Sequence, residues 1–173
     1  VLLWSINNNG VTMILYLGDW DSQGAIPDFK TSNKSFLHYV GLLKHMGIKN
    51  HLWPLQLFNT ALIGVNPHSP DLTNQQMLMI AQECKINLFY YLREVVRVPV
   101  SGSPDPIPFI ANRGNMCLMW CFLNHITILL EMIRQSGKSV SSDVLKSWIV
   151  NSRSYKVTIN LLTKDEKLKA KNL

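Results

Sequence analysis

The hexapeptide Arg-Gln-Ser-Gly-Lys-Ser at residues 134–139 carries the residue types that hold a nucleoside triphosphate. Gly137 lets backbone N–H groups approach a phosphate closely, and a helix that begins here adds its dipole. Lys138 supplies a mobile positive charge for the β and γ phosphates, and the Ser139 hydroxyl is the expected Mg²⁺ ligand. Arg134 precedes the loop, where a guanidinium can neutralise charge that develops on the γ phosphate.

The segments on either side of the hexapeptide favour the same interpretation. Residues 126–133 form an apolar run of strand length, and apolar residues recur at helical spacing after the loop. A second apolar segment follows at residues 157–162. We therefore expect a βαβ unit of a parallel sheet, in which Gln135, Ser136 and Val140 also line the phosphate site.

The loop departs from the full phosphate-loop pattern at one position. Met132 stands where Gly-x-x-x-x-Gly-Lys-Ser has its first glycine. A bare Gly-Lys-Ser/Thr tripeptide occurs by chance in about one chain in ten of this length, so the prediction depends on the elements around it. A degenerate loop in a protein without catalytic activity is the alternative.

The loop resembles that of the large-subunit terminases of tailed bacteriophages, the ATPases that drive DNA into the capsid. Their variant loop reads Arg-Gln-x-Gly-Lys-Ser/Thr without the leading glycine. The resemblance covers about residues 25–173. It includes the segments at 71–73 and 94–99, Asn-Arg-Gly-Asn at 112–115, and Asn-Leu-Leu-Thr-Lys-Asp at 160–165.

This resemblance implies ATP and Mg²⁺ as cofactors, with Arg134 and Lys138 as catalytic residues. It also places the adenine against the segment ahead of the phosphate strand, at Phe109, Asn112 and Arg113. The implied partners are double-stranded DNA, the phage portal and the small terminase subunit. The full-length protein would form an oligomeric ring in the host cytoplasm.

The expected fold class is α/β, with a helical lead-in followed by the start of a P-loop, RecA/terminase-like parallel-sheet ATPase domain that is truncated. Residues 1–24 predict a β-hairpin extension around an Asn-Gly turn, and residues 25–100 a helical N-terminal region. The Pro-, Gly- and Ser-rich residues 101–108 predict a stiff connector. Residues 109–173 would then start the ATPase domain.

Catalysis is expected to need more than this chain. Only residues 163–173 follow the predicted second strand, so the acidic pair that holds Mg²⁺ and activates water, and the family's nuclease domain, are expected outside it. We expect the chain to bind ATP and to be inactive as an ATPase on its own. A helicase-like DNA translocase is the alternative among enzymes, and a non-catalytic phage protein is the alternative from another class.

Capping residues predict helices in the N-terminal half. Ser32 or Asn33 can cap a helix that reaches Met46. Thr73 and Gln76 have the spacing of a capping box for a second helix. The inward side chains of this second helix are expected to be Met77, Ile80, Ala81 and Cys84.

Charge and cysteine content limit the partners only mildly. The chain has 17 Lys and Arg against 11 Asp and Glu, a net charge of +6, which favours an anionic partner. Six of the basic residues fall within residues 153–171, either facing DNA or on a solvated surface. Three cysteines without paired spacing favour a reducing compartment, and no apolar run reaches membrane-spanning length, so we expect no membrane partner.

Overall fold

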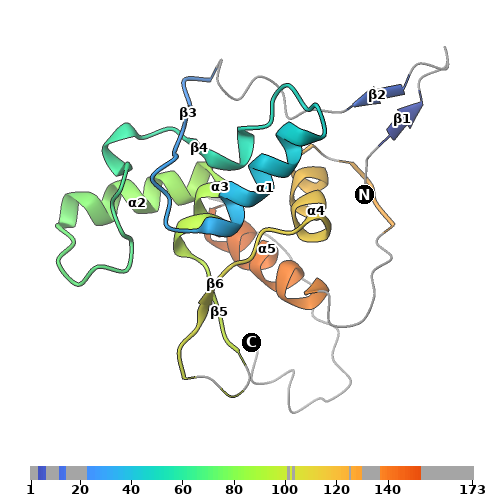
Figure 1. Ribbon diagram of the computed structural model, residues 1–173. Helices are drawn as coiled ribbons and strands as arrows, with labels where there is room; N and C mark the ends of the chain where they lie inside the picture. The colour runs from blue at the N-terminus through green and yellow to red at the C-terminus, as the bar shows by residue number, and fades with distance from the viewer. Residues whose placement is uncertain are drawn as a thin grey trace.

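Helices make up most of the regular structure in the computed structural model, which describes residues 4–6, 12–14, 23–100, 102, 104–124, 126–129 and 137–152. The helices are α1 (Lys34–His45), α2 (Asn74–Ile86), α3 (Leu88–Tyr90), α4 (Arg113–Leu123) and α5 (Lys138–Ser152) (Figure 1). Shorter helical turns are η1 (Trp53–Leu55), η2 (Thr60–Leu62) and the π-helical η3 (Tyr91–Val95), which continues directly from α3.

The strands form small antiparallel pairs. They are β1 (Trp4–Ile6) with β2 (Thr12–Ile14), β3 (Ile26–Pro27) with β4 (Gln56–Leu57), and β5 (Arg97–Val98) with β6 (Ile107–Pro108). Among the described residues no two strands pair in parallel. The structure is therefore α/β in the general sense of helices with small sheets, and the described part of the chain contains no parallel P-loop sheet.

The strand predicted ahead of the phosphate loop is not formed where the structure describes it. Residues 126–129 have no regular secondary structure, and the Ile126 N–H donates to the Cys121 carbonyl at 2.9 Å, which keeps the chain in the last turn of α4. Leu129 is 91% exposed, so this stretch is not a buried strand. The strand prediction is wrong for these residues, because an apolar run becomes a buried strand only beside a partner strand. Residues 130–136 and 157–162 lie outside the described residues.

One hydrophobic core joins α1, α3, α4 and α5. Its most deeply buried side chains include Phe36, Leu55, Leu88, Phe89, Leu92, Phe109, Met116 and Met119. Segments before and after residues 101–108 therefore pack into the same core. The end of that predicted connector is strand β6, where Ile107 pairs with Val98 of β5.

Helix α1 begins as its sequence predicts. The Asn33 side-chain oxygen accepts from the Ser35 N–H at 3.2 Å and so caps the helix. The same side chain donates through Nδ2 to the carbonyls of Arg93, at 3.1 Å, and of Phe109, at 2.9 Å. The predicted cap is confirmed at Asn33, and it also fixes the start of α1 against the segment that leads into α4.

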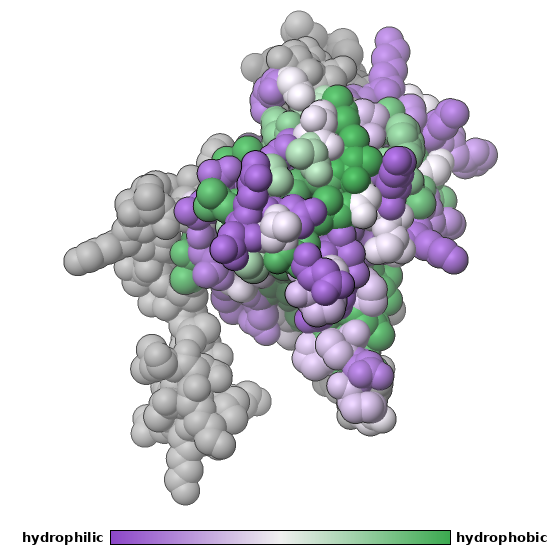
Figure 2. Space-filling model, turned by 90° about the vertical axis from the view of Figure 1, so that its left-hand side faces the viewer, coloured by the Kyte–Doolittle hydropathy of each residue, from purple (hydrophilic) through white to green (hydrophobic). Residues whose placement is uncertain are grey.

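Helix α2 confirms its predicted cap but not all of its inward face. The Thr73 hydroxyl accepts from the Gln76 N–H at 3.2 Å, and the Gln76 side chain accepts from the Thr73 N–H at 3.0 Å. Met77 is 49% exposed and Ala81 is also exposed, so the prediction that they point inward is wrong. Figure 2 shows this side of the molecule, where hydrophobic and hydrophilic surface is interspersed.

A carboxylate is buried on α2 in place of those apolar side chains. The Glu83 oxygens accept from the N–H groups of Phe58 and Asn59, both at 2.9 Å, and from Asn87 Nδ2 at 2.6 Å. The partners compensate for the desolvation of the carboxylate and hold the 58–59 turn against the end of α2. This contact orients α2 so that residues near its start face solvent.

Candidate phosphate-binding site

Helix α5 begins directly after the glycine of the predicted phosphate loop. Gly137 has φ of 82°, in the left-handed region that glycine adopts without strain, and Lys138 is the first helical residue. The Ser141 N–H donates to the Gly137 carbonyl at 2.9 Å. The N–H groups of residues 138–140 precede this bond, so they lack intrahelical acceptors and are suited to an anion.

A pocket of about 310 Å³ lies between the start of α5, the segment leading into α4 and the β5–β6 pair. Its apolar wall consists of Val98, Ile107, Pro108, Phe109, Ile110 and Val140. Its polar positions are Asn112, Asn115, Gly137 and Ser141. The pocket therefore combines an apolar surface for a flat ring with the N-terminal end of a helix.

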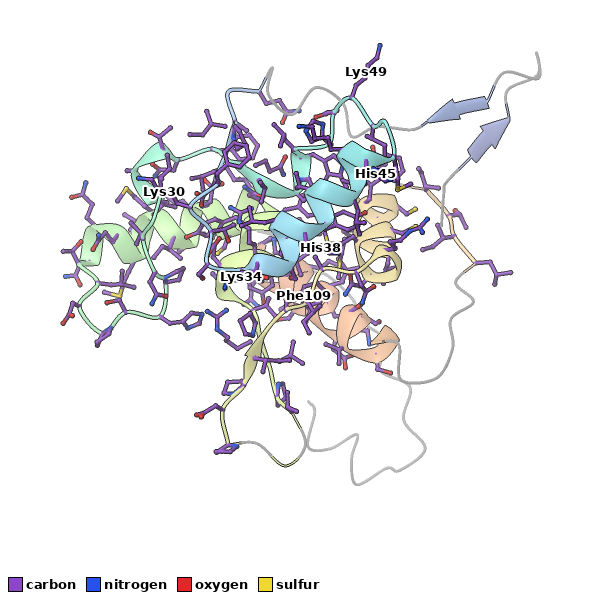
Figure 3. The ribbon with its side chains drawn as sticks, viewed as in Figure 1. Lys30, Lys34, His38, His45, Lys49 and Phe109 are labelled. Atoms are coloured by element: carbon purple, nitrogen blue, oxygen red, sulfur yellow. The ribbon has the colours of Figure 1, made fainter. Side chains whose placement is uncertain are left out.

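The pocket brings together four residues that the sequence assigned to one ligand from two separate segments. Phe109 and Asn112 stand before α4, and Gly137 and Val140 stand at the start of α5. Phe109 is only 2% exposed, since most of its ring packs in the hydrophobic core (Figure 3). An edge of the Phe109 ring therefore faces the pocket, while the core holds the ring in place.

Other predicted site residues lie outside the pocket or outside the described residues. Arg113 is exposed at the first position of α4 and Ser139 is exposed in the first turn of α5, and neither lines the pocket. For Lys138 the structure describes the backbone alone. Arg134 and residues 135–136, Gln135 and Ser136, lie outside the described residues.

Two polar residues of the pocket, Asn115 and Ser141, were not predicted from the sequence. The Asn115 side chain accepts from the Asn112 N–H at 2.9 Å, while the Asn112 side chain accepts from the Asn115 N–H at 3.0 Å. Asn115 also donates to the Ile110 carbonyl at 2.6 Å, so it fixes the pocket wall. The Asn-x-x-Asn spacing of a reciprocal cap was a usable signal for Asn115. Ser141 is buried only through the packing of α5, which its sequence does not reveal.

Helix α5 packs into the core through Leu145 and Trp148, with Val144 and Ile149 against it, and Trp148 also makes a hydrogen bond and a ring contact. Its indole N–H donates to the Cys84 carbonyl of α2 at 2.7 Å, and its ring lies edge-on to Phe122 of α4 with centroids 6.5 Å apart. The hydroxyls of Tyr91 and Ser147 are 3.2 Å apart. These contacts hold the C-terminal half of α5, about three turns from its N-terminal end at the pocket.

Burial shifts several ionisable groups, all of them outside the pocket. Desolvation raises the pKa of Cys84 from its ordinary value of 9.0 to about 12, and Glu83 adds to this shift. Desolvation also raises the pKa of Cys121 to about 12, with a smaller contribution from Cys117. Both thiols stay protonated at neutral pH, so they are poor nucleophiles and metal ligands. All three cysteines are free.

Within the part of the chain that the structure describes, no three His, Cys, Asp or Glu side chains gather as a metal site. A Mg²⁺ ion here would take its oxygens from a bound phosphate, from water and from a hydroxyl such as that of Ser139. None of the described helices has the length and apolarity needed to cross a membrane. Comparison with protein-family models, curated proteins and solved structures gives no significant match to the chain.

Proposed function

We propose that this chain is the ATP-binding N-terminal part of a phage terminase large subunit, a motor that uses ATP hydrolysis to package viral DNA into the capsid. The observation that carries the proposal is the pocket that joins the segment before α4 to the first turn of α5. The resemblance of residues 134–139 to the variant terminase loop supplies the choice of family.

The pocket has the chemistry that an adenine nucleotide needs. At about 310 Å³ it is at the small end of the range of ligand pockets, roughly 300–1,000 Å³, which suits a base and its ribose. The adenine would lie against Phe109 and Ile110. Its phosphates would then extend toward Gly137 and the N–H groups at the start of α5, where the helix dipole favours negative charge.

The loop residues have separate roles in this proposal. Lys138 binds the β and γ phosphates, and the Ser139 hydroxyl completes the coordination of Mg²⁺. Arg134 acts on the γ phosphate in the full-length motor, where it stabilises charge in the transition state. The proposal includes double-stranded DNA, the portal and the small terminase subunit as partners, a ring assembly, and the host cytoplasm as location.

Filling the pocket tests the proposal without disturbing the core. Val140 lines the pocket and is 38% exposed, so Val140→Trp introduces a ring into the pocket from its rim. We expect this variant to weaken Mg-ATP binding at least about tenfold, a loss of about 1.4 kcal/mol, in isothermal titration calorimetry. Val150→Trp is the matched control, because Val150 is an exposed valine of the same helix outside the pocket. Wild-type affinity in a folded Val140→Trp protein would exclude this pocket as the nucleotide site.

A second candidate function is a non-catalytic phage protein that retains a degenerate loop. Two observations favour it, namely Met132 at the position of the first glycine and the absence of a strand at residues 126–129. The two proposals differ in the dependence of binding on Lys138. Tight Mg-ATP binding that Lys138→Ala abolishes supports the motor, and no ATP binding by the wild type supports the non-catalytic protein.

A further inference from the structure

The exposed face of α1 carries a row of basic side chains. Lys34, His38 and His45 lie within about 40° of one another around the helix axis, because 3.6 residues make one turn. Lys49 follows beyond the end of the helix, and all four are exposed. Figure 3 shows them in succession along α1 and past its end. With Gly41, which falls on the same side of the helix, they form what we call the α1 basic face.

No acidic side chain lies on α1, on η1 or on α4. Residues 29–70 contain no Asp or Glu, and neither do residues 106–124, which include α4. Asp28 is 4% exposed and lies 3.7 Å from the buried Arg93 guanidinium, so its charge is directed inward. Arg113, exposed on α4, acts electrostatically on Tyr39 of α1 and so adds a further positive charge nearby. The positive charge of this face is therefore not offset by exposed carboxylates on these segments.

Gly41 has no packing role on the helix. A Cβ added at this position would meet no heavy atom within 4 Å, so the fold does not require glycine there. Glycine inside a helix costs about 1 kcal/mol relative to alanine. Its position between His38 and His45 leaves the middle of the basic face without a side chain, which allows a large ligand to approach the backbone.

We propose that the α1 basic face binds the phosphodiester backbone of double-stranded DNA. From Lys34 to His45 the face extends about 16 Å, a length that spans about five phosphates of one DNA strand. The choice of DNA rather than RNA rests on the proposed packaging function. The positive charge of the face is an observation that does not depend on that function. No residue of this face lines the nucleotide pocket, and we therefore expect DNA binding to be measurable without ATP.

The packing of α1 favours a nucleic acid over a membrane surface. A helix that lies on a membrane inserts its apolar face into the lipid. The apolar face of α1 is already used by the protein, since Phe36, Tyr39, Val40 and Leu43 are buried in the core. Leu42 and Met46 are exposed beside this face, each at 37%, whereas its centre consists of the lysine and histidine side chains and the open position at Gly41.

Charge reversal on the face tests the inference directly. The variants are Lys34→Glu/Lys49→Glu and Gly41→Glu, whose new side chain has open space. Fluorescence anisotropy with a labelled duplex of about 30 base pairs gives the affinity at about 50 and about 200 mM salt. We expect the double variant to bind at least about tenfold more weakly, with a salt slope smaller by about two. We also expect Gly41→Glu to bind several-fold more weakly.

Lys85→Glu is the matched control, because Lys85 is an exposed lysine on α2. It should bind DNA like the wild type. Equal DNA affinity for the double variant and this control would overturn the inference. So would tighter binding of an RNA of the same length, or equally tight and equally variant-sensitive binding of phosphatidylserine vesicles.

A Mg-ATP titration of the same proteins separates this inference from the proposed function. The double variant should keep wild-type ATP affinity, because Lys34 and Lys49 do not line the pocket. Face-dependent DNA binding in a protein that binds no ATP would support the DNA surface and contradict the ATPase proposal. ATP binding that requires Lys138, without DNA binding that requires the α1 basic face, would support the ATPase proposal and contradict the DNA surface.

Discussion

Buried polar side chains hold the N-terminal elements together and fix the segment before α4 that forms part of the pocket wall. Helix α5, which completes the pocket, is held instead by the apolar packing of Leu145 and Trp148 and by the Trp148 N–H. Asn33, Glu83 and Asn87 are each buried and each hydrogen-bond at least two other segments or side chains. Arg93 is fully buried and bonds to Glu94 and to the Pro54 carbonyl. Removing a partner from such a group leaves a buried polar atom unsatisfied, at a cost of about 1–3 kcal/mol.

This difference in attachment separates the residues that stabilise the fold from those that determine ligand affinity. The Asn33 side chain donates to the Phe109 carbonyl and the Ser35 hydroxyl accepts from the Ala111 N–H, so they fix residues 109–115 together with the reciprocal Asn112–Asn115 cap, whether or not a ligand is present. The start of α5, which offers the N–H groups, lies about three turns from its anchor at Trp148. We therefore expect substitutions in the polar clusters to unfold the protein, and substitutions on α5 to affect ligand affinity with a small loss of stability.

The largest effect is expected at Asn87. Its side chain is fully buried, donates to the Gln56 carbonyl and to Glu83, and accepts from the Tyr90 N–H. Asn87→Ala should lower the free energy of unfolding by about 3 kcal/mol or more in urea titrations, because it leaves the Glu83 carboxylate and a buried N–H short of partners.

Asn151→Ala supplies the comparison on α5. Asn151 is exposed and donates to the Ser147 carbonyl of its own helix, so its loss should cost less than about 1 kcal/mol. Similar losses of stability for the two alanine variants would contradict the distinction between the polar clusters and α5.

A smaller effect is expected at the anchor of α5. Trp148→Phe keeps an aromatic ring against Phe122 but removes the N–H that donates to the Cys84 carbonyl. We expect a loss of about 1 kcal/mol in the free energy of unfolding. ATP affinity should fall as well, because the start of α5 then shifts relative to the pocket wall. Unchanged ATP affinity together with reduced stability would show that the anchor does not position the site.

The last effect is absent at neutral pH and is expected only under alkaline conditions, above about pH 9. The raised pKa of Cys84, about 12 against an ordinary 9.0, means that the folded state keeps its proton where the unfolded state loses it. This group's stabilising contribution is therefore full below about pH 9 and is lost progressively as the pH rises toward 12. Denaturation curves at a series of pH values should show this decline, and Cys84→Ala should make it shallower. If the free energy of unfolding of Cys84→Ala declines with pH as steeply as that of the wild type, Cys84 is not the cause of the decline.

Local capping chemistry was predictable from the sequence, and long-range packing was not. Asn33 and the Thr73–Gln76 box act on N–H groups within three residues, so spacing alone identifies them. The burial of Glu83 depends on N–H groups some 24 residues away, at Phe58 and Asn59. The sequence spacing therefore placed Met77 and Ala81 inward, whereas α2 buries Glu83 together with the partly buried Ile80 and Cys84.

The candidate site also combines features that the local sequence predicts with features that depend on distant parts of the chain. The start of α5 at Lys138 follows from Gly137 and the helical spacing after it, which are local signals. The expected strand at residues 126–133 required a partner strand, and the described residues 126–129 continue from the last turn of α4 instead. That Phe109 meets Gly137 in one pocket could be expected only from the family resemblance, because no local pattern links them.

The most direct test of the central claim is a Mg-ATP titration of Lys138→Ala against Lys146→Ala. Both lysines belong to α5, but Lys146 pairs with Asp143 at 3.2 Å on the exposed surface, away from the pocket. We predict that Lys138→Ala weakens ATP binding at least about tenfold with an unchanged melting temperature, and that Lys146→Ala binds ATP like the wild type. Equal ATP affinity in the two folded variants would contradict a phosphate site at the start of α5.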